Sequence, residues 1–476
     1  MNALAAMLRP VAAEETRMAT PQTRGYVINL VRNLSPVSLE HEIQRAAEAG
    51  FNLLLFPIYN NGWTLFPSEA ARSYGMKRIS PLFSKWNPLA EACRIARAAG
   101  LTVWAYGRPF NFHPRFSIAE HKLLHSHPDW RLRAHPNYQT AYHRRYEIWH
   151  PCPLNKDYRR YIGDVLTEVA HGYPVSGVVL YYSSYGLHGG SLHNFPYCFC
   201  DSCLEQYREA FDGADLVADG INNMERIRQW QLEMSHETLG YLRHRILRAR
   251  RALRFICRAR PHWRMEPPTQ RVIDRNVRLM DWPELMESGA VDELLIDPDD
   301  EPLSANLGSR LAADYAFLGD RVLFSPIVTV EDPASLRVPI RMLYKYPIPG
   351  FIVQFQNLMT PDEALAIRES YFSEPAMIAE ASPVRTAIWL LDQVRLRHQD
   401  GSPLGPLMAD MLRILTRQLP MPDNFSMLQV IEQNILGVEQ FIRRGRLEPV
   451  KVGDDVLRYL GLARRFVRMA GLDVRA

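Results

Sequence analysis

The chain has 476 residues, of which 47% are hydrophobic and 23% charged, and its formal net charge is +4 at pH 7. These are ordinary globular values, and the length allows one large domain plus a smaller one, or about two to three average domains. Because lysine and arginine are scattered, the mild charge gives no case for a nucleic-acid partner. No stretch approaches the ~18 uninterrupted apolar residues of a membrane-spanning helix, so we expect no membrane partner.

The first 24 residues begin with a short apolar stretch that Arg9, Pro10 and two glutamates interrupt. A secretory signal needs a basic start and a longer apolar run, and neither is present. We therefore expect a loose N-terminal tail over residues 1–24 and a cytoplasmic protein.

From Gly25 to Glu374, short apolar runs alternate with amphipathic stretches, which is the order of βα units and a parallel sheet. Most runs are rich in Val, Ile, Leu and Phe, as in strands that are buried on both faces. The predicted strands are Tyr26–Leu30, Phe51–Ile58, Leu101–Tyr106, Val175–Tyr182, Arg254–Ala259, Val291–Asp297, Arg321–Val328 and Gly350–Gln356.

Amphipathic stretches with helical periodicity separate these runs, and they predict helices over 38–49, 87–99, 156–171 and 224–252. Strands and helices in this alternation predict an α/β fold, a (β/α)8 TIM barrel over residues 25–374 with an inserted loop-rich region. A doubly wound open sheet is the alternative, but no glycine-rich phosphate loop follows any of the predicted strands.

Beyond Pro375 the strand pattern stops, and we expect a helical C-terminal domain over residues 375–476. Its basic clusters, RRGR and ARRFVR, are typical of solvated helix faces, and binding of an anionic partner is the alternative. The predicted helices are 385–399, 405–419, 424–444 and 453–471.

Four cysteines predict a metal site. Cys198, Cys200 and Cys203 form a C-x-C-x2-C run, and Cys152 lies upstream in HPCPLN. Four thiolates suit tetrahedral zinc and leave no open position for water, so we expect a structural zinc; disulfides, which are rare in the cytoplasm, and unligated thiols are the alternatives. Two further cysteines are expected to be ordinary core residues: Cys93 and Cys257.

Two sets of segments resemble known glycoside hydrolases. PCPLNKDYRRYI, YGLHGG and YCFCDSCLEQYREAF resemble the part of family 42 glycoside hydrolases (β-galactosidases) that holds their structural zinc. NLLLFPIYNNGWTLFPSEAA, WNPLAEACRIARAAGLTVWAYGRPFNF and LNKDYRRYIGDVLTEVAHGYPVSGVVL are similar to the domain of family-10-like glycosyl hydrolases. Together these resemblances cover roughly residues 25–357. They imply a TIM-barrel glycoside hydrolase, a carbohydrate substrate and a homo-oligomer.

Glycoside hydrolysis uses two carboxyl groups, and barrel active sites lie at the C-terminal ends of the strands. Asp297 directly ends the predicted sixth strand and is the first candidate, although a solvated acidic loop is the alternative interpretation of its segment, DPDDE. The full set of catalytic candidates is Asp297, Asp299, Glu301 and Glu331.

Polar and aromatic residues after other strands are candidates for substrate binding. An arginine beside aromatic residues suits sugar hydroxyls or a uronate carboxylate, and tryptophan faces can stack on sugars. These candidates are Trp63, Arg108, Asn111, His113, Tyr181, Tyr182, Arg260, His262 and Trp263.

The carboxylate that both resemblances imply after the fourth strand is absent. Where family 42 has Asn-Glu-Tyr-Gly, this sequence has Ser184 in place of the glutamate, and where the family-10-like pattern has an aspartate pair it has Tyr181 and Tyr182. A serine hydroxyl cannot deliver a proton at neutral pH as a carboxylic acid can. Three possibilities stay open: the acid lies on another strand, the protein is a lyase that uses tyrosine with arginine or histidine, or the barrel binds glycans without catalysis.

Overall fold

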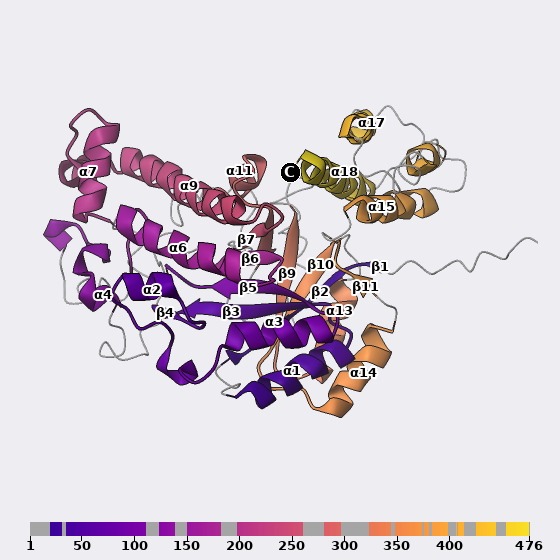
Figure 1. Cartoon of the computed structure of the whole chain (residues 1–476). Coiled ribbons are helices and arrows are strands. Elements are labelled where there is room, and N and C mark those ends of the chain that lie inside the picture. The colour runs from indigo at the N-terminus through magenta and orange to yellow at the C-terminus, as the bar shows by residue number, and fades with distance from the viewer. Residues whose placement is uncertain are drawn as a thin grey trace, which may run out of the picture.

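The described residues of the computed structural model form a closed barrel of eight parallel strands with helices outside it (Figure 1). The circle closes because the first barrel strand pairs with the second and with the last. The predicted TIM barrel is therefore confirmed. Its strands are β2 (Thr23–Val27), β3 (Leu53–Asn60), β5 (Thr102–Gly107), β6 (Gly177–Tyr181), β7 (Arg254–Ala259), β8 (Glu293–Ile296), β9 (Phe324–Val330) and β10 (Gly350–Phe355).

Some segments of the chain are left out of this description. The structure describes residues 20–30, 35–110, 123–138, 150–181, 198–259, 280–296, 323–343, 348–373, 376–379, 383–397, 406, 408–413, 425–443 and 454–475. None of the helices in these ranges is both long and apolar enough to cross a membrane.

Several of the outer helices begin where the sequence offers a side-chain cap. Asn87 and Asn155 each accept a hydrogen bond from the backbone N–H three residues further on, and Thr360 does the same within a capping box. The helices that follow barrel strands are α1 (Pro36–Glu48), α3 (Pro88–Ala98), α6 (Lys156–Gly172), α9 (Met224–Ala249), α11 (Trp282–Glu287), α13 (Arg337–Leu343) and α14 (Pro361–Tyr371).

The barrel has two separate cores, as the alternation of side chains along its strands requires. On β8, Leu295 belongs to the interior cluster, whereas Leu294 and Ile296 pack outward against the helices. Tyr106 and Tyr181 lie in the same interior cluster, near the C-terminal ends of their strands. The interior is thus filled by side chains, and its C-terminal layer is aromatic and polar.

Gly177, the first residue of β6, leaves room for the Trp104 side chain inside the barrel. A Cβ atom at position 177 would lie 2.8 Å from Trp104 Cδ1. We therefore expect Gly177→Ala to lower the free energy of unfolding by about 1–3 kcal/mol, as overpacking of a core does. Urea unfolding checks this. As the control, Gly172→Ala at the end of α6 meets nothing within 4 Å and should be neutral or stabilising.

The C-terminal helices cover the N-terminal end of the barrel. Ile378 packs against the barrel interior, and the guanidinium of Arg254, at the start of β7, contacts the sulfur of Met469 in α18. In Figure 1 α15 and α18 lie on the side of the barrel away from α2 (Glu69–Ser73) and α7 (Asp201–Ala210). The long C-terminal helices are α15 (Pro383–Arg397), α17 (Phe425–Arg443) and α18 (Asp454–Arg475).

These helices fit three of the four that the sequence predicts beyond Pro375, and α18 packs against both others. Within the fourth range, 405–419, the described residues 406 and 408–413 are helical. The boundary at residue 375 stays a prediction.

A short parallel pair of strands connects the segment before the first barrel strand with the segment after α14. β1 (Thr20–Pro21) pairs with β11 (Ala376–Met377), and β2 begins at Thr23. Residues 20–24 are therefore largely in strands rather than in the expected loose tail, because Thr20 and Pro21 pair with β11 while Thr23 and Arg24 pair with β10. Residues 1–19 lie outside the described residues.

Candidate active site and metal centre

Most of the predicted active-site residues lie outside the described part of the chain. Two candidates for substrate binding, Arg108 and Tyr181, come together at the C-terminal edge of the barrel, and Trp63 lies half-buried in β4 (Trp63–Thr64). Glu331 follows β9 directly and is exposed. The candidates outside the described residues are Asn111, His113, Tyr182, Arg260, His262, Trp263, Asp297, Asp299 and Glu301.

Two arginines and two tyrosines from three adjacent strands meet at this edge. Arg108 Nε donates a hydrogen bond of 2.8 Å to Tyr106 Oη, and Arg258 Nη1 donates one of 2.9 Å to the same oxygen. The Tyr181 ring lies beside both arginines, with its centroid 4.8 Å from Arg108 Cζ and 5.3 Å from Arg258 Cζ. We call these four residues the arginine–tyrosine group.

Arg258 and Tyr106 were missed as site residues by reasoning from the sequence. Arg258 is only 6% exposed, and Tyr106 is 8% exposed. Arg258 stands two residues after Ile256, an interior residue of the same strand, so period-2 alternation places it inside the barrel. An arginine at an inward position near the C-terminal end of a buried strand is the sequence signal by which Arg258 could have been recognised as a site residue.

The strand end that carries Arg108 is held by α6. Arg108 N donates to Tyr59 O at 3.1 Å, and the hydroxyl of the fully buried Tyr158 donates to the carbonyl of Pro109. The Phe110 ring packs edge-on against Tyr158, with centroids 5.7 Å apart. Burial raises the pKa of Tyr158 well above its usual value, so its hydroxyl stays a donor at neutral pH.

Replacing this tyrosine tests the anchor. Tyr158→Phe leaves the Pro109 carbonyl without that donor, and we expect the free energy of unfolding to fall by about 1–3 kcal/mol. Urea denaturation measures the loss. The matched control is Tyr241→Phe, whose half-buried hydroxyl accepts from Arg245 while that arginine also pairs with Asp164; it should cost less than about 1 kcal/mol. Equal losses of unfolding free energy in the two variants would show that the contact with the Pro109 carbonyl contributes no more to stability than a half-buried tyrosine hydroxyl does.

The four cysteines that the sequence predicts as metal ligands converge in the structure. All four are buried, and their sulfur atoms lie within 4.8 Å of one another, with Cys152 and Cys203 at 3.5 Å. Tetrahedral zinc with Zn–S bonds of about 2.3 Å needs sulfurs about 3.8 Å apart. The donor set therefore fits a thiophilic metal ion. None of the six cysteines forms a disulfide.

The ligands come from two segments that the barrel brings together. Cys152 precedes α6, and Asn155, which caps that helix, donates its own N–H to the Cys152 carbonyl at 3.2 Å. Cys200 is the N-cap of α7, and Cys203 lies in its first turn. Local sequence places three ligands on one turn, while the fold supplies the fourth.

A small hydrophobic core surrounds the cysteines and is distinct from the barrel's cores. It is formed by α7, by α8 (Leu216–Asn222), by the first part of α9 and by the segments that contain Leu132, Ala134 and Leu154. Tyr207 packs edge-on against Trp230, with centroids 5.1 Å apart. We call this unit the cysteine subdomain. Since its core is small, cross-linking by a metal ion would contribute a large part of its stability.

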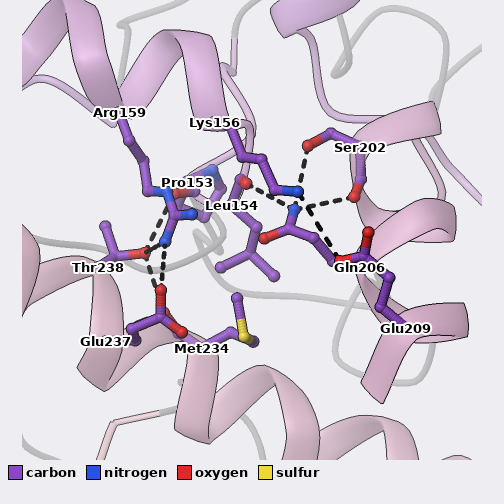
Figure 2. A network of polar contacts seen from close by, with 10 residues as sticks. All are labelled: Pro153, Leu154, Lys156, Arg159, Ser202, Gln206, Glu209, Met234, Glu237 and Thr238. Carbon is purple, nitrogen blue, oxygen red and sulfur yellow. Dashed lines mark hydrogen bonds and ion pairs between the residues drawn. The ribbon is translucent and has the colours of Figure 1, made fainter. Parts of the chain in front are cut away.

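Polar contacts fasten the cysteine subdomain to α6 and α9 (Figure 2). Gln206 Nε2 on α7 donates to Leu154 O at 2.9 Å, and Thr238 Oγ1 on α9 donates to Pro153 O at 3.3 Å. Arg159, which is 8% exposed, donates to Thr238 Oγ1 at 3.3 Å. The residues next to Cys152 are thus held from both sides.

The protonation of the cysteines also fits a cation. Burial raises the pKa of Cys152 and of Cys198, whereas hydrogen bonding with Cys152 raises the pKa of Cys203 and lowers that of Cys200 well below its usual value. Metal ligation requires the thiolate forms, and a divalent cation would supply the positive charge that stabilises them. Two backbone N–H groups, of Arg133 and Cys200, already point at Cys198 Sγ at 3.1 and 3.3 Å, as around metal thiolates.

Comparison with known proteins identifies the family. The model of the family described as glycosyl hydrolase-like 10 matches residues 23–306, which is more than half of the chain. The protein therefore belongs to this glycosyl hydrolase-like family, and the predicted family-10-like resemblance is confirmed. No curated protein matches the sequence significantly.

Solved structures with a similar fold include several glycoside hydrolases. The catalytic domain of β-amylase from Paenibacillus polymyxa has a TM-score of 0.50 at 10% identity, over 74% of this chain and 98% of that one. The β-galactosidase from Marinomonas ef1 (TM-score 0.46, 10% identity) matches 73% of this chain and 59% of its own. The α-L-fucosidase isoenzyme 2 from Paenibacillus thiaminolyticus has a TM-score of 0.45 at 15% identity, over 74% of this chain and 49% of that one. Likeness at such identities concerns the fold alone.

Proposed function

We propose that this protein is a glycoside hydrolase that cleaves a glycosidic bond at the C-terminal edge of its barrel. The observation that carries the proposal is the family membership of a closed (β/α)8 barrel whose C-terminal layer holds the arginine–tyrosine group. Donors such as Arg108 bind sugar hydroxyls or a charged substituent, and the Tyr181 ring offers a face for stacking. A carbohydrate substrate follows from the family.

The carboxyl chemistry is assigned to the segment after β8. On β8, the Leu295 side chain lies inside the barrel and that of Ile296 lies outside. Continued by one residue, this alternation of the strand assigns the next inward position to Asp297. Asp297 therefore acts as one of the two carboxyl groups, and Asp299, Glu301 or Glu331 supplies the other. This assignment replaces the carboxylate that is absent after β6, where Tyr181 ends the strand.

A search for released reducing ends tests the function. The purified full-length protein is incubated with a panel of plant, bacterial and animal polysaccharides, and new reducing ends are measured over time. We expect release from at least one polysaccharide. Binding in a glycan array without any cleavage would instead make the protein a catalytically inactive glycan-binding barrel.

A lyase is the second candidate, because Tyr106 Oη accepts hydrogen bonds from two guanidinium groups. The two positive charges next to this oxygen favour a developing anion there. A lyase reaction leaves an unsaturated product that absorbs in the ultraviolet, whereas hydrolysis does not. The same incubations therefore separate the two reactions.

We also propose that the four cysteines bind zinc and that this zinc is structural. Four buried thiolates leave no open coordination position, so the ion would hold the cysteine subdomain and take no part in catalysis. A reducing compartment keeps such thiols available, which agrees with the cytoplasmic location that the sequence predicts. That location and a homo-oligomer stay predictions.

A further inference from the structure

We propose that the barrel mouth recognises a carboxylate on its saccharide substrate, and that Arg108 binds this carboxylate beside the positive charge of Arg258. The inference rests on the proposed function, since it names the class of substrate for the same site: an acidic saccharide that contains a hexuronate or another carboxyl-bearing sugar.

The guanidinium of Arg108 is arranged to bind a further acceptor. Its Nε donates to Tyr106 Oη at 2.8 Å, but its two terminal nitrogens donate no hydrogen bond to any described residue. The stacking of Tyr181 against this guanidinium, at 4.8 Å, restricts its motion. A planar fork of N–H donors fixed in this way matches the two oxygens of a carboxylate.

A second positive charge stands next to the first. Arg258 Nη1 bonds to the same Tyr106 oxygen, so two guanidinium groups lie within hydrogen-bond distance of one atom. Arg258 is 6% exposed, and charges act more strongly where water is largely excluded. No described carboxylate forms an ion pair with Arg108. A bound anion would pair with the guanidinium of Arg108, whereas a neutral sugar would offer it no charge.

A carboxylate matches the donors of Arg108 in shape as well as in charge. Arg108 offers its donors in one plane, and a carboxylate presents two oxygens in a plane, so the two groups can pair side by side. A lysine at this position would keep the charge but lose the fork. The inference thus requires both the charge and the shape of the arginine side chain.

Binding of acidic oligosaccharides and their neutral counterparts tests the inference. Calorimetry with the full-length protein would use tetrasaccharides of hyaluronan, alginate and pectate, each also in the carboxyl-reduced form. We expect at least one acidic tetrasaccharide to bind about tenfold or more tightly than its carboxyl-reduced form. Arg108→Gln should weaken binding of the acidic form by about 10- to 100-fold, and the affinity of Arg108→Lys should lie between those of the wild type and Arg108→Gln. Binding of the reduced form should change by less than about threefold.

Arg94→Gln is the matched control, because Arg94 is exposed on α3 and pairs with Glu91 on the outer face of the barrel. This variant should bind like the wild type. The inference is overturned if no acidic tetrasaccharide binds, if acidic and reduced forms bind equally, or if a sulfated neutral oligosaccharide binds more tightly than all of them. Cleavage of a neutral glycan that Arg108→Gln leaves unchanged would overturn the inference while the proposed hydrolase stands. Binding of an acidic oligosaccharide that depends on Arg108, without cleavage of any glycan, would overturn the proposed hydrolase while the inference stands.

Discussion

Cys203→Ser is expected to unfold the cysteine subdomain and to lower the stability of the whole protein by about 3–5 kcal/mol. Cys203 is fully buried, its sulfur lies 3.5 Å from that of Cys152, and serine provides a poor ligand for a thiophilic ion. Binding of a structural zinc is coupled to folding, so losing one ligand loses much of the ion's contribution to stability. A calorimetric scan would show the lower midpoint, and elemental analysis would show about one zinc per wild-type chain and little in the variant.

The matched control for this variant is Cys93→Ala. Cys93 is a buried cysteine of α3 that packs in the outer core, far from the four ligands in the fold. Burial raises the pKa of Cys93 to about 12, so its thiol stays protonated at neutral pH and is a poor ligand. Cys93→Ala should keep the full zinc content. Wild-type protein that contains no metal, or a Cys203→Ser variant that keeps its metal, would contradict the assignment.

Treatment with a strong chelator should reproduce the effect of the mutation. Without the ion, the helices α7 and α8 would be held only by their small core. We expect proteases to cut between residues 198 and 222 in the chelated protein, while the barrel strands stay resistant. Added zinc should restore the wild-type pattern.

Asp297→Asn is expected to lower kcat by about 100- to 10,000-fold on any glycan that the protein cleaves, while the thermal midpoint stays unchanged. An amide can neither donate a proton as an acid nor attack the anomeric carbon as a carboxylate, although it fills the same space. The rate of reducing-end release from the best substrate of the polysaccharide panel measures this loss. An inverting or a retaining outcome, read from the anomer released first, then defines the role of the second carboxyl group.

The control for the catalytic variant is Glu284→Gln, the same chemical change on an exposed residue of α11. It should keep full activity. Glu331→Gln separates the candidates for the second carboxyl group, because Glu331 is exposed at the end of β9. Full activity in Asp297→Asn would remove that residue from the mechanism, and a large loss in Glu331→Gln would make Glu331 one of the pair.

Reasoning from the sequence located the barrel because its signals are local. Seven of the eight apolar runs contain all or most of a barrel strand, and the run Arg254–Ala259 matches β7 at both ends. The first run, Tyr26–Leu30, shares only Tyr26 and Val27 with β2, which begins three residues earlier. The helices also begin within about two residues of the expected positions, since side chains such as Asn87 and Asn155 cap them. Residues 20–24, expected to belong to the tail, lie largely in strands instead, because their pairing partners in β10 and β11 lie far along the chain.

Of the four cysteines, three could be predicted to lie together from local sequence, whereas the position of the fourth depends on the tertiary structure. The spacing of Cys198, Cys200 and Cys203 predicts a metal-binding turn by itself, because a short turn is enough to bring three sulfurs together. The fourth predicted ligand, Cys152, lies far upstream in the sequence, and its approach to within 3.5 Å of Cys203 depends on how α7 docks beside α6. That docking is made by contacts such as Gln206 to Leu154 O, which no local pattern shows.

The sequence by itself determined the alternation of strands and helices and the cysteine turn, because each depends on neighbouring residues. Only the tertiary structure decided that Arg108 and Arg258 meet at one tyrosine oxygen. The two arginines are far apart in the chain, and their meeting depends on the register of β5, β6 and β7 and on the closure of the barrel. Register and closure result from packing of the whole chain, so residue patterns could not supply them.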